Sequence, residues 1–135
     1  MNYWLIKSEP SVYSFDQLKK EKKTAWTGVR NYAARNNLRA MKKGDLCLYY
    51  HSNEGLCIVG VAKVVKEAYQ DPTTEDKNWV CVDVAPAETF KNPVALSVLK
   101  TDKVLKNMQF VRIGRLSVSV VTEEEFDLVK KLSCN

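Results

Sequence analysis

The segment from residue 26 to residue 39, WTGVRNYAARNNLR, places cations and amides beside an aromatic anchor. Its polar and aromatic side chains include Trp26, Arg30, Asn31, Arg35, Asn36, Asn37 and Arg39. The guanidinium group of arginine stays charged and offers a planar fork of donors that suits phosphates, carboxylates or base edges. The amide of asparagine matches a nucleobase edge, and the indole of Trp26 offers a flat surface for stacking. The segment therefore predicts a recognition surface.

A helix over residues Val29–Met41 would arrange part of this segment as one stripe. Asn31, Ala34, Arg35 and Leu38 recur at helical spacing, and Ala34 leaves room for a close approach. The alternative interpretation is an ordinary solvated helix whose apolar residues are partly packed. The packed side chains would then be Val29, Ala33, Leu38 and Met41.

A hairpin is predicted from residues 45–51 and 56–68, with a loop between them. A regular register pairs His51 with Cys57, Tyr49 with Val59 and Cys47 with Val61 on one face, and Tyr50 with Ile58 on the other. His51, the only histidine of the chain, then lies at a strand end, where a polar side chain can meet a ligand. A half-exposed histidine hydrogen-bonded to loop backbone is an equally good interpretation.

Catalytic and metal chemistry find little support in the sequence. The cysteines, Cys47, Cys57, Cys81 and Cys134, lack the paired spacing of a zinc site, and we expect reduced, structural thiols. The enzyme alternative is a hydrolase acting on a modified nucleoside, which would use His51 with Glu9 or with Cys57. The chain has no nucleophile elbow, metal pair or glycine-rich phosphate loop. We therefore predict no catalytic residue, no metal and no cofactor.

Short elements of both types must position these residues. Strands are predicted at residues 3–7, 79–84 and 115–120, and a helix at residues 15–22. Ser14 with Gln17, and Thr122 with Glu125, have the spacing of capping boxes, the second opening a C-terminal helix. Residues 90–106 combine an extended segment with a short helical turn around residues 96–99. The order predicts a single α+β domain over residues 1–135 with a mostly antiparallel, curved or barrel-like sheet, and with Trp4 and Trp79 in its core.

Composition sets the outer limits of these expectations. The chain has 135 residues, a net charge of +5 and a pI near 9.0, which modestly favours a polyanionic partner. No apolar run approaches the roughly 20 residues of a membrane span. The strand-like YWLIK starts almost at residue 1, which argues against a signal peptide. We expect a cytoplasmic protein without a membrane partner.

Five sequence blocks together resemble the EVE domain family: WLIKSEP at residues 4–10, WTGVRNYAARNNLR at 26–39, KKGDLCLYYHSN at 42–53, GVAKVVKEAYQDPT at 60–73 and RLSV at 115–118. The blocks occur in order across nearly the whole chain. The resemblance implies a PUA-like fold, a β-barrel flanked by helices, related to the YTH and ASCH domains. It also implies a pocket that accepts a modified base of DNA or RNA.

The resemblance also implies the pocket residues. These are Lys7, Ser8, Trp26, Gly28, Val29, Arg30, Asn31, Tyr50, His51, Ser52, Arg115, Leu116 and Ser117. The family often has Tyr-Pro-Asp where this chain has Tyr69-Gln70-Asp71, which should affect a loop bend. It often has a polar residue where this chain has Gly114, a difference that falls at the pocket rim.

The residue types suit a base that has left its stack. Such a base needs an apolar or aromatic wall, groups that pair with its edge, and cations for the neighbouring phosphates. Trp26 and Tyr50 can supply the wall, Val29 and Leu116 a contact for a methyl group, and Ser8, Asn31, His51 and Ser117 the edge contacts. Lys7, Arg30, Arg35 and Arg39 can supply the cations, with Arg35 and Arg39 assigned to phosphates. The other alternative is a domain that binds a small ligand or a protein partner. The sequence does not distinguish DNA from RNA as the ligand, and it does not determine the modification or the oligomeric state.

Overall fold

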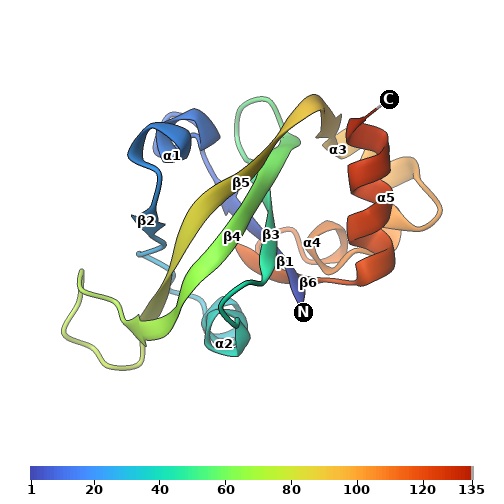
Figure 1. Cartoon of the computed structure of the whole chain (residues 1–135). Helices are drawn as coiled ribbons and strands as arrows, with labels where there is room; N and C mark the ends of the chain where they lie inside the picture. Colours follow the sequence, from blue (N-terminus) through green and yellow to red (C-terminus); the bar gives the residue numbers. More distant parts are fainter. Residues whose placement is uncertain (135) are drawn as a thin grey trace.

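Six strands form one mixed sheet, with helices on both of its faces, in the computed structural model, which describes residues 1–134 (Figure 1). The strands are β1 (Tyr3–Ser8), β2 (Thr24–Ala25), β3 (Leu46–His51), β4 (Cys57–Gln70), β5 (Val80–Ala95) and β6 (Val118–Val121). The helices are α1 (Phe15–Glu21), α2 (Tyr32–Ala40), α3 (Leu96–Thr101), the short 3-10 helix η1 (Leu105–Asn107), α4 (Gln109–Arg112) and α5 (Glu123–Ser133). The predicted α+β class is confirmed.

The sheet is curved but open. Its strand order is β2-β5-β4-β3-β1-β6, and the paired strands are antiparallel except β1 with β3. Among the described residues the edge strands β2 and β6 do not pair with each other, so the predicted barrel is not closed. Side chains occupy the outer edge of β6 instead: Asn37 donates to the carbonyl of Val118 at 2.7 Å, and Gln109 accepts from the amide of Val120 at 2.8 Å. Helix α2 packs against both β5 and β6.

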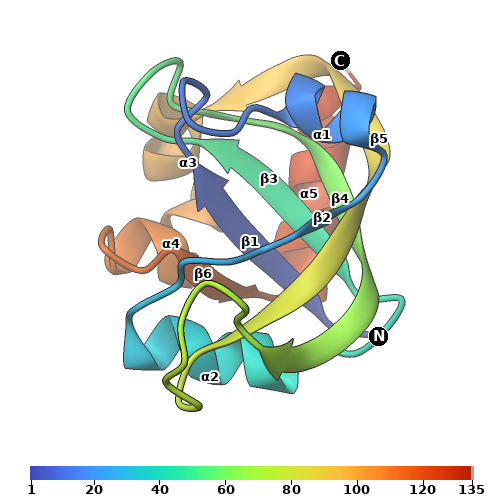
Figure 2. The ribbon, with the colours of Figure 1, turned by 90° about the vertical axis from the view of Figure 1, so that its left-hand side faces the viewer.

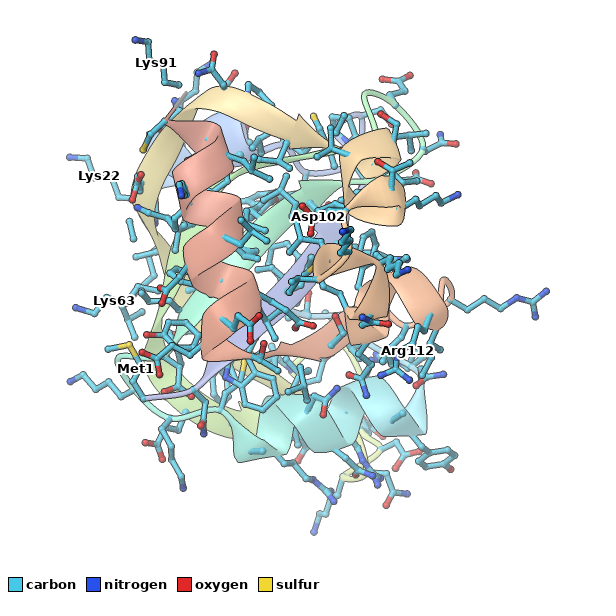
Figure 3. The ribbon with its side chains drawn as sticks, turned by 90° about the vertical axis from the view of Figure 1, so that its right-hand side faces the viewer. Met1, Lys22, Lys63, Lys91, Asp102 and Arg112 are labelled. Carbon is cyan, nitrogen blue, oxygen red and sulfur yellow. The ribbon has the colours of Figure 1, made fainter. Side chains whose placement is uncertain are left out.

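The sheet has a hydrophobic core on each face, and alternate side chains of one strand belong to different cores. On β1, Trp4 and Ile6 belong to a first core that includes residues of α1 and α2, whereas Leu5 belongs to a second core that includes residues of α5. Strand β3 repeats this pattern, with Tyr49 in the first core and Tyr50 in the second. Figure 3 views the second face, where α5 lies across the strands. Neighbouring residues of one strand therefore serve opposite sides of the sheet.

A β-bulge at the start of β4 changes the hairpin register. His51 pairs with Cys57 and Tyr50 with Ile58, as predicted, but Tyr49 lies opposite Gly60 instead of Val59, and Cys47 opposite Ala62 instead of Val61. The physical reason is close packing at Gly60. A Cβ atom there would lie 2.5 Å from the carbonyl oxygen of Glu88 and 2.6 Å from the ring of Phe15. Only glycine fits this approach, and the extra residue of the bulge shifts the rest of the pairing.

Three predicted element boundaries are wrong. The strand expected to end at residue 84 is β5, which continues to Ala95. The helix expected over residues 29–41 begins at Tyr32, because Asn31 has an extended backbone and its side chain accepts a hydrogen bond from the amide of Ala34 at 3.0 Å. The strand expected from residue 115 begins at Val118, and the residues before it form a turn and a bend. By contrast, the capping box of Thr122 and Glu125 is fully formed at the start of α5.

The cysteines are free thiols, and Cys47 and Cys81 are buried, as predicted for structural residues, whereas Cys57 is half-buried and Cys134 is exposed. No helix within residues 1–134 is long and apolar enough to cross a membrane. Over the same range, no group of three His, Cys, Asp or Glu side chains is arranged to hold a metal ion.

Candidate functional site

A cavity of about 410 Å³ opens where the chain from β2 to α2 passes the sheet. Figure 2 faces this side of the molecule and shows the segment crossing in front of β1 on its way from α1 to α2. The volume lies within the range typical of small-ligand sites. Elements far apart in the sequence meet here, since β1, the turn before α1, β2 with the segment that follows it, and the approach to β6 all contribute.

Trp26 forms a rigid apolar wall of the cavity. Its side chain is only 8% exposed and belongs to the first core. The indole packs edge-on against the rings of Tyr49 and Tyr13, with centroid separations of 5.4 Å and 6.2 Å. Val29, which is 6% exposed, adds an aliphatic contact. The wall is therefore held in place by the core before any ligand arrives.

The rim segment that follows Trp26 is tied down by Asp71, a buried carboxylate in the loop between β4 and β5. The amide of Gly28 donates to Oδ2 of Asp71 at 2.8 Å, and the guanidinium of Arg30 does so at 3.1 Å. The amide and hydroxyl of Thr73 donate to Oδ1. Burial alone would raise the pKa of Asp71, but the hydrogen bonds from Thr73, Gly28 and Arg30 outweigh it and lower the pKa to about 2. Gly28 suits this anchor because its φ of +83° is unfavourable for other residues.

Lys7 lies at the opposite side of the cavity, where β1 approaches the turn before β6. Its ammonium donates to the carbonyl of Gly114 at 2.6 Å and lies 5.4 Å from the centroid of the Phe110 ring. Its backbone amide donates to the carbonyl of Ser117 at 3.1 Å. Burial lowers the pKa of Lys7. The contacts join β1 to the 114–117 turn and hold the ammonium beside Phe110, a residue of the second core.

The structure brings together about half of the residues predicted for the pocket. The predicted residues that line the cavity are Lys7, Ser8, Trp26, Gly28, Val29, Arg30 and Ser117. Those that do not line it are Asn31, Tyr50, His51, Ser52, Arg115 and Leu116. Leu116 is packed in the first core and Arg115 is exposed. Tyr50 points to the other face of the sheet, where its ring lies 4.5 Å from that of Phe110, because the neighbouring Tyr49 faces the cavity side.

The side chain of His51 binds the backbone at the start of α1. Its Nε2 atom accepts a hydrogen bond from the amide of Phe15 at 3.1 Å, so the ring is neutral with its proton on Nδ1. Burial lowers the pKa of His51, although the nearby Asp16 acts in the opposite direction. The arrangement matches the half-exposed, backbone-bonded histidine that was the alternative interpretation. Ser52 is engaged next to it, since its amide donates to the carbonyl of Ser8 at 3.0 Å.

The two arginines predicted to contact phosphates lie on α2, outside the cavity. Arg35 lies over the ring of Tyr32, with its guanidinium carbon 4.9 Å from the centroid, and donates to the side chain of Asn36. Arg39 is exposed one turn later. The ring of Tyr32 also lies 5.1 Å from that of Trp79. Trp79 is half-buried at the surface and belongs to neither core cluster, so its predicted place in the core is wrong.

The sequence interpretation missed several residues of the cavity. These are Val12, Tyr13, Thr24, Ala25 and Thr27. Val12 and Tyr13 occupy a turn and Thr24 and Ala25 a two-residue strand, neither of which is long enough to show a periodic pattern, and Thr27 lies in the irregular segment that follows the strand. Asp71 was also missed as an anchor, although it stands in one of the blocks that carry the family resemblance.

Comparison with known proteins gives a consistent picture. The model of the EVE domain matches residues 2–132. Human thymocyte nuclear protein 1 is 39% identical over 97% of this chain and 73% of its own length. The crystal structure of a protein from Agrobacterium tumefaciens superimposes with a TM-score of 0.96 at 46% identity, covering 98% of this chain and 93% of that one. The crystal structure of the human THYN1 protein in complex with 5-methylcytosine-containing DNA superimposes with a TM-score of 0.91 at 37% identity, covering 100% and 99% of the two chains.

Proposed function

The chain belongs to the EVE domain family, and from this we propose that it is a DNA-binding reader domain whose cavity beside Trp26 accommodates a modified base. The observation that carries the proposal is the composition of that cavity, which joins a fixed aromatic wall to polar side chains. A relative that covers the whole chain was crystallised with DNA containing 5-methylcytosine. This base is therefore the first candidate ligand.

The cavity meets the requirements of a flipped base in three ways. Trp26 and Val29 offer apolar surface in place of the lost stacking. Hydroxyl groups, including those of Ser8 and Thr27, offer edge contacts. Arg30 lines the cavity and supplies a positive charge at its rim, where it is paired with Asp71. A single methyl group in an apolar pocket contributes only about 1 to 3 kcal/mol, so we expect moderate discrimination between cytosine and 5-methylcytosine.

We also propose that binding proceeds without chemistry. His51 is outside the cavity lining, and its Nε2 atom already accepts a bond from the backbone. Proton transfer near neutral pH would need a group of suitable pKa within reach of the ligand. The bound oligonucleotide should accordingly be recovered with unchanged mass after prolonged incubation with the protein.

The proposal also covers the type of fold and the contacts with the bound strand. We take the open, curved sheet to be a variant of the PUA-like barrel, acting as one unit over residues 1–135. We assign Arg35 and Arg39 to the phosphates of the bound strand. RNA binding and a cytoplasmic location stay predictions from the sequence.

Blocking the cavity tests the proposal. Thr27 is exposed and lines the cavity, so Thr27→Trp should fill the space without removing a core side chain. The matched control is Ser97→Trp, because Ser97 is exposed on α3 and does not line the cavity. With duplexes that differ in a single 5-methylcytosine, we expect Thr27→Trp to lose about tenfold in affinity for the modified duplex, a loss of about 1.4 kcal/mol. Equal binding of the modified duplex by wild type and a folded Thr27→Trp protein would rule out this cavity.

A further inference from the structure

Val12 is an apolar side chain held out into solvent at the mouth of the cavity. It is 75% exposed, more than any other large hydrophobic residue in the described part of the chain except Met1. It is also one of the residues that line the cavity. Isolated apolar residues on a protein surface are common and need no explanation by themselves. Val12 differs from an isolated surface residue because it is exposed at a cavity large enough for a base, where a ligand can contact it.

The turn that carries Val12 is rigid. The carbonyl of Glu9 accepts hydrogen bonds from the amides of Val12 and Tyr13, at 2.9 Å and 2.8 Å. The hydroxyl of Tyr49 donates to the carbonyl of Tyr13 at 2.9 Å. Pro10 has a fixed φ and stiffens the same turn. The side chain of Val12 is thus presented by a frame that is anchored in the first core.

The frame also couples Val12 to the wall of the cavity. The residue after it, Tyr13, packs its ring edge-on against Trp26 at 6.2 Å. Helix α1 starts soon after this turn, and its first amide, from Phe15, is held by His51. A base that stacks beside Trp26 would therefore pass close to Val12 as it enters.

We propose that Val12 is a wedge that enters the DNA stack where the modified base has been extruded. When a base leaves a duplex, its neighbours lose stacking contacts, and the opening costs a few kcal/mol. Proteins that unstack DNA often insert an apolar side chain into the step, because it replaces some of the lost contact. The inference rests on the proposed function of the cavity and assigns Val12 to the duplex, whereas Trp26 contacts the extruded base.

A comparison of duplex and single-stranded DNA tests the wedge. Both targets carry one 5-methylcytosine in the same sequence, but only the duplex requires a base to leave a paired stack. Val12→Ala should weaken duplex binding by about tenfold, since part of a buried apolar contact is lost, and should change single-strand binding by less than about twofold. Val12→Leu should retain duplex binding. The control is Val98→Ala, because Val98 is 40% exposed on α3 and does not line the cavity.

The possible outcomes separate the wedge from the cavity. An equal loss on duplex and single strand would make Val12 part of the cavity wall and overturn the wedge. Unchanged binding of both targets by Val12→Ala would overturn it as well. If the wild-type protein binds neither target, the proposed function fails and the wedge falls with it. Unfolding should not obscure the result, because a side chain that is 75% exposed contributes little to the core.

Discussion

Asn31 was predicted to recognise a base, but in the structure its side chain caps a helix. Its residue type suits a base edge, but in the structure its Oδ1 atom accepts from the amide of Ala34 and caps α2. A polar side chain before a run of good helix formers is also the sequence signal of an N-cap. The cap explains why α2 begins at Tyr32, and it keeps the carboxamide outside the cavity lining.

We predict that Asn31→Ala destabilises the protein by about 1 kcal/mol, because it leaves an amide of the first turn without its partner. Asn31→Ser should restore most of this loss, since a serine hydroxyl can accept the same bond. Urea denaturation of the three proteins gives the free energies of unfolding. Unchanged stability of Asn31→Ala, together with loss of discrimination between modified and unmodified DNA, would return Asn31 to base recognition.

At the scale of elements, regular patterns were predictable and short or irregular segments were not. The strands β1 and β3 and the capped helices α1 and α5 lie where alternation and capping residues indicated. The two-residue strand β2 and the four-residue helix α4 are too short for a periodic signal. The bulge before Gly60 depends on its contact with Glu88, far along the chain, and no local pattern contains that information.

Some residues of the candidate site could likewise be predicted from the sequence, and others could not. The resemblance predicted the residues that follow β2, which fold as a continuous segment beside the sheet. It also assigned Tyr50 to the pocket, although alternation along β3 turns this ring to the opposite face from Tyr49. The contribution of the turn with Val12 follows from long-range packing against Trp26 and Tyr49 through Tyr13. Tertiary contacts of this kind are not readable from local spacing.

The loop between β4 and β5 fixes the cavity rim through Asp71, and this makes the rim sensitive to acid. The pKa of Asp71 is lowered from its ordinary 3.8 to about 2, so its contribution is complete above about pH 4 and is lost as pH falls toward 2. We expect on the order of 2 kcal/mol of unfolding free energy to disappear in this window. Asp71→Asn should lower stability at pH 7 and flatten the acid limb in denaturation experiments.

A control variant separates this anchor from general acid sensitivity. Asp127→Asn changes a carboxylate on α5, on the side of the sheet away from the cavity, and should leave the acid limb close to that of wild type. If Asp71→Asn keeps the acid limb of wild type, the carboxylate does not anchor the rim as the geometry indicates.

At the scale of the whole molecule, positive charge is spread widely while the cavity itself holds little of it. The cation of Arg30 is paired with Asp71, and Lys7 is partly buried. Figure 3 shows Lys22, Lys63 and Lys91 along one edge of the molecule and Arg112 on the other side. A net charge of +5 distributed in this way gives general attraction to a polyanion, but only cations close to the bound strand can neutralise its phosphates.

Arg35 and Arg39 are the cations that we assign to this strand, because α2 follows directly after the rim segment and both side chains are at its surface. Each of Arg35→Ala and Arg39→Ala should remove about one phosphate contact and make the slope of log affinity against log salt less steep by about 0.9. The loss should be equal for modified and unmodified DNA, since phosphates carry no information about the base. Lys91→Ala, at an exposed position on β5 outside the cavity, should leave the slope unchanged. A slope that responds equally to all three substitutions would mean that DNA is attracted by the total charge, and that α2 does not define the path of the strand.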